Sequence, residues 1–179
     1  MATNWVFGSK NIPIKLASTY WATERNATMT PDEGLIDTMT HSKEWLRRQG
    51  IGIEGNITGL SMLHSFVGGE HIEFIGGSRY ADDGLILSLC NERSKFIMKK
   101  LRKTACVKIL DVELLKTIVD SQITTVGIMR SCEYTGSHNR NHFLKSCADS
   151  WQCEFRMFWQ GISNIAVSIP AGLAEPVTF

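Results

Sequence analysis

The stretch WQCEFRMFWQ, residues 151–160, decides the expected fold because it is typical of a β-strand, yet it carries two opposite charges. Alternate side chains of a strand share one face. The pattern therefore predicts a core face of Cys153, Phe155 and Met157, and a polar face of Gln152, Glu154 and Arg156 with neighbours about 7 Å apart. A strand that only needs burial has no use for a charged pair, so the polar face is the first candidate site.

The chain before this stretch also favours β-structure. From Ile51 onwards, apolar residues alternate with small ones, and glycine pairs interrupt them, which is typical of antiparallel strands. The pairs Gly68-Gly69 and Gly76-Gly77 are expected at hairpin turns. We expect strands at about 58–66, 71–76, 84–90, 105–112, 124–134, 151–160 and 162–170.

Three helices are expected between and before these strands. Residues 30–50 begin with Thr30-Pro31, carry acids early and arginines late, and end at Gly50, a charge order that suits the helix dipole. Residues 91–103 form a short basic helix that would bury Phe96 and Ile97, and 112–122 form an apolar one. The sequence thus predicts an α+β fold in one domain, 1–179, with a helical part at about 1–50 and a mainly antiparallel β-rich core at about 51–179.

Composition sets the broad class. The 179 residues are 43% hydrophobic and 21% charged with a net charge of +1, so any nucleic-acid binding must rest on a local patch. Five cysteines in mostly apolar settings indicate reduced thiols. Because no apolar run approaches the ~18 residues that span a bilayer, we expect a cytoplasmic protein without a membrane partner.

A polar loop at 135–150 precedes the decisive strand. It carries His138, Arg140, His142 and Lys145, and a carboxylate on a rigid strand beside an adaptable loop is a common way to build a site. Zinc bound by the loop histidines and nearby cysteines is the lesser alternative because their spacing is not that of a familiar zinc module. No metal site is expected.

The Gln-X-Glu of residues 152–154, on a strand after a long loop, resembles the catalytic signature of the ADP-ribosyltransferase fold. Enzymes of that family cleave NAD at the nicotinamide glycosidic bond and pass ADP-ribose to a target. Their second motif, a strand with a serine that supports the nicotinamide site, is similar to LILSLC here, with Ser88 at its centre. The resemblance implies a split-sheet fold over about residues 60–170.

The resemblance also implies roles for individual residues. Glu154 would be catalytic, Gln152 would orient the acceptor, and Arg156 would brace Glu154 or reach a phosphate. The loop at 134–150 would read the target, and Ser88 would contact NAD. The first NAD-clamping motif has no clear match; the candidates for NAD binding are His64, Arg79 and Tyr80.

The physical reason for a carboxylate is plain. Breaking an N-glycosidic bond develops positive charge on the ribose, and a fixed carboxylate stabilises that charge in a site of low dielectric constant. An arginine nearby should keep Glu154 ionised. The leading hypothesis is a mono-ADP-ribosyltransferase that uses NAD as substrate and modifies protein, DNA or RNA, in the manner of a bacterial or phage toxin or defence effector with a neutralising antitoxin as partner.

Two alternatives stay open. In the first, the protein is a non-enzymatic binding module that grips a partner through the 134–150 loop and the basic helix at 91–103, and Glu154 and Arg156 form a structural pair. In the second, it is a nuclease or other hydrolase that uses Glu154, His138 or His142, and Lys145.

Overall fold

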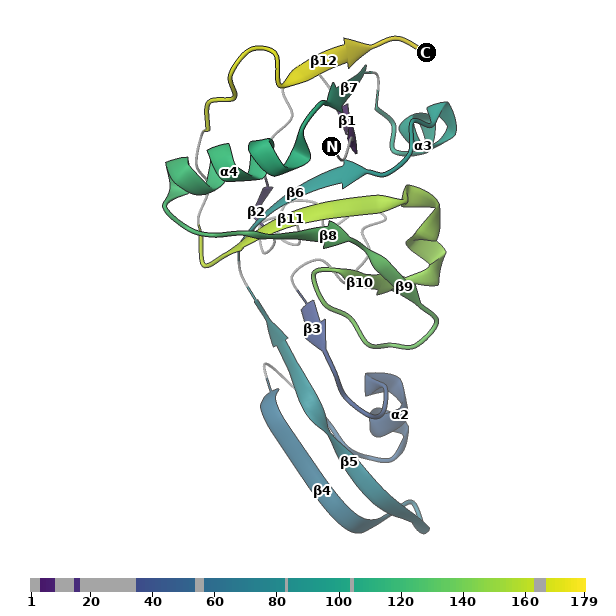
Figure 1. Cartoon of the computed structure of the whole chain (residues 1–179). Coiled ribbons are helices and arrows are strands. Elements are labelled where there is room, and N and C mark those ends of the chain that lie inside the picture. The colour runs from purple at the N-terminus through teal and green to yellow at the C-terminus, as the bar shows by residue number, and fades with distance from the viewer. Residues whose placement is uncertain are drawn as a thin grey trace.

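The strands form three sheets of unequal size (Figure 1). The computed structural model describes residues 35–53, 57–82, 84–103, 105–162 and 167–179, together with the backbone of 4–8 and 15–16. Within these residues the protein is one small domain of mixed type, mostly antiparallel β-sheet with a few short helices. The expected α+β class is thereby confirmed.

The largest sheet has seven strands, and the decisive stretch forms one of them, β11, between β6 and the edge strand β8. Its main path runs β12-β7-β1-β6-β11-β8, with β2 beside β6, and every pairing in it is antiparallel. The strands are β1 (Asn4–Gly8), β2 (Lys15–Leu16), β6 (Gly84–Cys90), β7 (Ala105–Ile109), β8 (Ile128–Ser131), β11 (Glu154–Gln160) and β12 (Ala174–Val177).

Helix α4 (Val112–Ile123) covers one face of this sheet (Figure 1). Asp111 caps its first turn by accepting a hydrogen bond from the Leu114 amide at 2.9 Å. The helix buries one face against alternate residues of β6 and β11, because residues three or four apart share a helix side and alternate residues share a sheet face. The resulting core contains Val112, Leu115, Val119 and Ile123 from α4, Leu85, Leu87 and Leu89 from β6, and Met157 and Trp159 from β11.

A second, smaller body of the fold is a long hairpin that projects from the large sheet (Figure 1). Strands β4 (Ile57–Val67) and β5 (Glu70–Ala81) pair antiparallel, and β3 (Leu35–Asp37) lies on the other side of β5. Helix α2 (Lys43–Arg48) begins at the cap Ser42 and packs Leu46 against Ile75 and Val67. This apolar cluster joins α2 to the hairpin.

Of the two glycine pairs, one behaves as expected. Gly68 and Gly69 have φ angles of 60° and 87° and form the β4–β5 turn, which confirms the hairpin there. The expected turn at Gly76-Gly77 is wrong, since both residues lie inside β5. The Phe74 ring lies over Gly76, where a Cβ would approach it to 2.1 Å, so this glycine makes room for an aromatic ring.

The remaining elements cover the other face of the large sheet or flank it. They are α3 (Lys95–Lys100), β9 (Glu133–Thr135), β10 (Leu144–Ser146) and the 3-10 helix η1 (Cys147–Gln152). Strands β9 and β10 pair parallel in a two-stranded ribbon, which Figure 1 shows below β11 and β8.

The strands expected at 58–66, 71–76 and 84–90 are confirmed, as is the helix at 112–122. The single helix expected over 30–50 is wrong in its described part, because residues 35–37 form β3 and the helix begins only at Lys43. The described part of 1–50 is therefore mixed and not simply helical. At the C-terminal end, β12 closes the sheet at Ala174–Val177, beyond the expected 162–170, of which 163–166 lie outside the described residues.

Candidate functional site

The polar face of β11 does carry a cluster of charges, but the cluster is buried. Glu154 is 5% exposed, Arg156 is 0% exposed, and Lys145 of β10 is 1% exposed. Because Met157 is buried on the opposite face, β11 is covered on both sides. The ribbon β9–β10 and the 3-10 helix provide the cover over the charged side.

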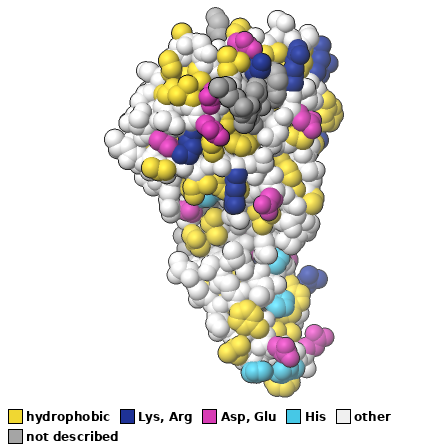
Figure 2. Space-filling view, viewed as in Figure 1, with side chains coloured by type: hydrophobic (Ala, Val, Ile, Leu, Met, Phe, Trp, Pro, Cys, Tyr) yellow, Lys and Arg dark blue, Asp and Glu magenta, His cyan; other side chains and the backbone are white. Residues whose placement is uncertain are grey.

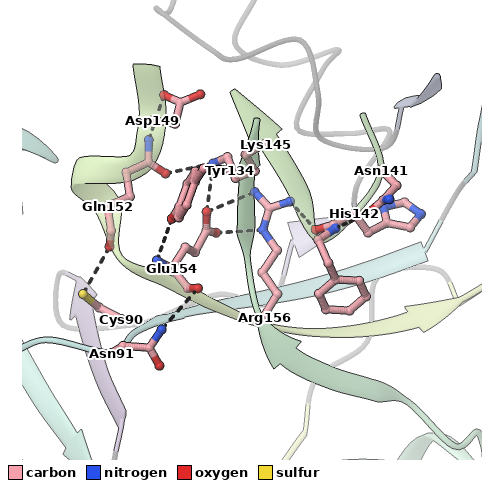
Figure 3. A network of polar contacts seen from close by, with 11 residues as sticks. Cys90, Asn91, Tyr134, Asn141, His142, Lys145, Asp149, Gln152, Glu154 and Arg156 are labelled. Carbon is pink, nitrogen blue, oxygen red and sulfur yellow. Dashed lines mark hydrogen bonds and ion pairs between the residues drawn. The ribbon is translucent and has the colours of Figure 1, made fainter. Parts of the chain in front are cut away.

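Three side chains form the centre of this cluster, which we call the ion triad: Lys145, Glu154 and Arg156 (Figure 3). Arg156 binds the carboxylate through two nitrogens, Nε to Oε1 at 2.8 Å and Nη2 to Oε2 at 3.2 Å. Lys145 Nζ donates to Oε2 at 2.8 Å. Both carboxylate oxygens of Glu154 are thus engaged by cations, the geometry of strong charge-assisted hydrogen bonds.

A second shell of polar groups fixes the ion triad in place. Lys145 also donates to Gln152 Oε1 at 2.8 Å, and Gln152 Nε2 donates to Asp149 Oδ1 at 3.2 Å. The Glu154 backbone amide donates to the Tyr134 hydroxyl at 2.9 Å. Arg156 Nη1 donates to the His142 carbonyl at 2.6 Å (Figure 3). Polar contacts therefore join β9, the loop before β10, β10, η1 and β11 around the ion triad.

Electrostatics keep Glu154 ionised. Burial alone would raise the pKa of its carboxyl group, but the charges of Arg156 and Lys145 and their hydrogen bonds outweigh burial and lower the pKa to about 2. Burial also raises the pKa of Tyr134, which stays a neutral phenol. Glu154 is therefore a carboxylate over the whole neutral range.

The local sequence explains why Gln152 is not on the strand. Ser146 caps the 3-10 helix by accepting a hydrogen bond from the Ala148 amide, and Cys153 ends it in the left-handed conformation with φ 45°. Strand β11 starts only at Glu154. The expectation that residues 152, 154 and 156 share a strand face is wrong for Gln152, whose side chain reaches the ion triad through Lys145 instead.

The loop residues expected to contact a target divide into two groups. His142 and Lys145 are buried and point into the protein, so they do not face a partner. His138 Nε2 lies 2.8 Å from the Met39 carbonyl, and the Arg140 backbone pairs with Asp37 of β3 at 2.8 and 2.9 Å. The described 134–150 segment therefore ties the large sheet to the β3–β5 body.

The residues expected to bind NAD are dispersed. Ser88 lies directly opposite Arg156 on neighbouring strands and is exposed, so it shares the face of Glu154. Arg79 forms an ion pair with Asp37 at 3.3 Å, and Tyr80 follows it on β5. His64 is exposed on the β4–β5 hairpin, where its ring stacks on His71. Only Ser88 is brought to the ion triad.

The sequence does not indicate that Tyr134, Asp149 and Asp82 lie near the polar face of β11. Asp82 Oδ2 lies 3.2 Å from His142 Nε2, and the His142 ring stacks on Phe158 at 3.7 Å between ring centroids. Burial lowers the pKa of His142, and the neighbouring Asp82 opposes that effect. No spacing in the sequence links residues 82 and 142, so only the fold could reveal this pair.

A separate candidate lies on the surface around α3. All six cations between residues 91 and 103 are exposed, and Glu92 is the one acid among them. This segment carries a net charge of +5, while the whole chain carries +1, so the rest of the chain sums to −4. Figure 2 shows Lys and Arg side chains gathered at the upper right, where Figure 1 places α3.

Aromatic rings lie among these cations. Phe96, expected to be buried, is 64% exposed, and Ile97 is the buried residue of α3. Lys100 Nζ lies 3.9 Å from the centroid of the half-buried Trp151 ring and 5.6 Å from that of Phe96. We call this region the basic–aromatic surface; it consists of Arg93, Lys95, Phe96, Lys99, Lys100, Arg102, Lys103, Trp151 and Phe179.

Comparison with known proteins found no family model, no curated protein and no solved structure that matches this chain. Among the described residues, none of the helices is both long and apolar enough to cross a membrane. The function must therefore be argued from the two candidate sites alone.

Proposed function

We propose that the protein is a binding module that takes up nucleic acid on its basic–aromatic surface. The single observation that carries this proposal is the concentration of six exposed cations within residues 91–103 of a chain that is otherwise net acidic. A polyphosphate gains affinity from such a patch because each neutralised phosphate releases a condensed counterion. The ion triad then has a structural role.

Two features favour this function over a merely solvated helix face. A solvated amphipathic helix buries its apolar residues and exposes charge, whereas here Phe96 is exposed among the lysines. The cations also come with rings from other segments: Trp151 from η1 and Phe179 from the C-terminal end. Interleaved cations and aromatic rings are the features with which proteins bind single-stranded nucleic acid.

The first test removes two cations. The double variant Lys99→Ala/Lys100→Ala is expected to lower affinity for a fluorescein-labelled oligonucleotide about tenfold at about 50 mM salt. It should also reduce the slope of log K against log salt by about 1.4, because each phosphate contact on a single strand contributes about 0.7. Fluorescence anisotropy across a salt series measures both quantities.

The matched control is Arg47→Ala/Arg48→Ala. These two exposed arginines end α2, a helix as short as α3, so the control removes the same charge from a different body of the fold. Its affinity should stay within about twofold of wild type. If both double variants weaken binding equally, only global charge matters and the proposed surface is wrong.

ADP-ribosyl transfer remains a second candidate, and the observation in its favour is the placement of Ser88. The register puts Ser88 opposite Arg156 and on the same sheet face as Glu154. In the described conformation, however, both Glu154 oxygens are held by cations and the side chain is 5% exposed. The closed ion triad therefore does not offer this carboxylate to a ribose, and the split-sheet fold of that family stays a prediction.

The NAD hypothesis has its own test. If the protein uses NAD, millimolar NAD should raise its melting temperature and nicotinamide should be released over hours. Glu154→Gln, which keeps the shape of the side chain, should abolish release, while Glu113→Gln on the exposed side of α4 should not. Absence of both stabilisation and nicotinamide release in the wild-type protein would end this candidate and leave the binding function in place.

A further inference from the structure

Each aromatic ring of the basic–aromatic surface is paired with a cation. Lys100 lies between Phe96 and Trp151, and Arg93 Cζ lies 5.3 Å from the Phe179 ring centroid. Arg93 also donates to the Thr178 carbonyl at 2.7 Å, which fixes the C-terminal segment against the start of the basic stretch. Rings from three segments that are distant in sequence are thus brought to one charged region.

These cation–ring pairs indicate a ligand that offers more than negative charge. A phosphate chain can bind to lysines and arginines alone, and rings add nothing to that contact. Rings at the same surface suit a ligand that presents a phosphate and a flat apolar face in each repeating unit. An unstacked nucleotide is such a ligand, because its base offers a π-face and its backbone a charge.

We propose that the basic–aromatic surface binds single-stranded nucleic acid, with bases stacked on Phe96 and Trp151 and phosphates held by the neighbouring lysines. This inference rests on the proposed function and names its ligand class. In a duplex the base faces are covered by the neighbouring base pairs, and only groove edges and phosphates remain accessible. The two rings would then contribute nothing to the affinity for a duplex, and only the lysines would bind it.

The position of Lys100 allows its ammonium group to exchange its aromatic contacts for a phosphate contact. Its ammonium group now lies against Trp151 and within cation–π distance of Phe96. When a base stacks on either ring, the ammonium group is close to the phosphate of the same nucleotide. Each intramolecular cation–ring pair is thereby replaced by a base–ring contact and a cation–phosphate contact, without a change in the fold.

The experiment compares strand forms of one sequence. Labelled single strands of about 12 nucleotides, within the usual site size, are titrated as DNA and as RNA beside the DNA duplex of equal length. The single strands are expected to bind at least about tenfold more tightly than the duplex at equal salt. Equal affinity for the DNA and RNA strands supports base stacking as the chemistry that they share. Binding of only one of the two strands supports the same surface with that nucleic acid as its ligand.

Variants separate stacking from charge. Phe96→Ala should weaken single-strand binding about tenfold and leave duplex binding unchanged, since it removes a ring and no charge. The matched control is Phe66→Ala, which removes a ring that is 75% exposed on the distant β4–β5 hairpin. Trp151→Phe should eliminate part of the tryptophan quenching that the single strand causes in the wild-type protein.

The outcomes distinguish this inference from the proposed function. If duplex and single strand bind alike and Phe96→Ala changes neither, the stacking inference is overturned while nucleic-acid binding stands. If no nucleic acid binds at low salt, both fail. If Phe66→Ala weakens binding as much as Phe96→Ala, the rings act through stability and the inference is again overturned.

Discussion

Replacing Glu154 by alanine is expected to lower the free energy of unfolding by about 3–5 kcal/mol, because it leaves two buried cations without their counter-charge. Lys145 and Arg156 are 1% and 0% exposed, so neither can reach water without opening the cover of the ribbon and the 3-10 helix. Urea denaturation followed by tryptophan fluorescence measures the loss. For a domain whose total stability is about 5–15 kcal/mol, a change of this size removes a large fraction of it.

Two control variants accompany Glu154→Ala: one at an exposed glutamate, and one that keeps the shape of Glu154 without its charge. Glu113 lies exposed in the first turn of α4, and Glu113→Ala should change stability by no more than about 0.5 kcal/mol. Glu154→Gln should fall between wild type and Glu154→Ala, since the amide still accepts hydrogen bonds but carries no charge. A Glu154→Ala protein as stable as wild type would show that the buried triad is not closed in solution.

Acid should destabilise the folded protein through the same residue. The pKa of Glu154 is about 2 in the folded state and near 4.5 when unfolded, so the folded state binds fewer protons between these values. Its contribution is complete above about pH 4.5 and is lost as pH falls towards 2. The shift corresponds to about 3 kcal/mol of stability at neutral pH.

Urea midpoints between pH 6 and pH 2.5 test this expectation. The wild-type protein should lose stability more steeply than Glu154→Gln over this window, because the variant no longer has a proton to bind at that position. Asp120 contributes in the same direction: burial would raise its pKa, but hydrogen bonds from Lys116, Trp159 and the Gly127 amide lower it. Asp120→Asn should therefore remove a separate part of the slope, and parallel slopes in wild type and Glu154→Gln would contradict the assignment to Glu154.

The local pattern of the sequence was enough to place several elements. Alternation within residues 84–90 and 151–160 identified two strands whose apolar side chains pack under α4, although the second begins only at Glu154, and helical spacing identified α4 itself. The closeness of Glu154 and Arg156 also follows from the chain, because residues two apart on a strand share a face. The density of cations in 91–103 needs no structure to be seen.

Local sequence patterns could not predict which charged residues are buried or which distant residues they contact. Nothing near Glu154 in the sequence indicates that Lys145 would bind its carboxylate, or that Tyr134 would accept its amide hydrogen. These contacts exist because β9 and β10 pair parallel and fold back over β11. No local sequence pattern indicates such contacts between separate segments. The sequence therefore predicted an open catalytic strand, whereas the structure has a closed ion triad.

The same division applies to the basic–aromatic surface. The sequence alone determined that residues 91–103 are basic and predicted a helix over them, since charge and helix signals are local; the structure forms that helix at Lys95–Lys100. Only the tertiary structure decided that Ile97 turns inward and Phe96 outward, and that Trp151 and Phe179 arrive beside the cations. The physical reason is that the exposure of an aromatic ring depends on the elements packed around it. Here those elements come from segments about 50 or more residues away in the chain.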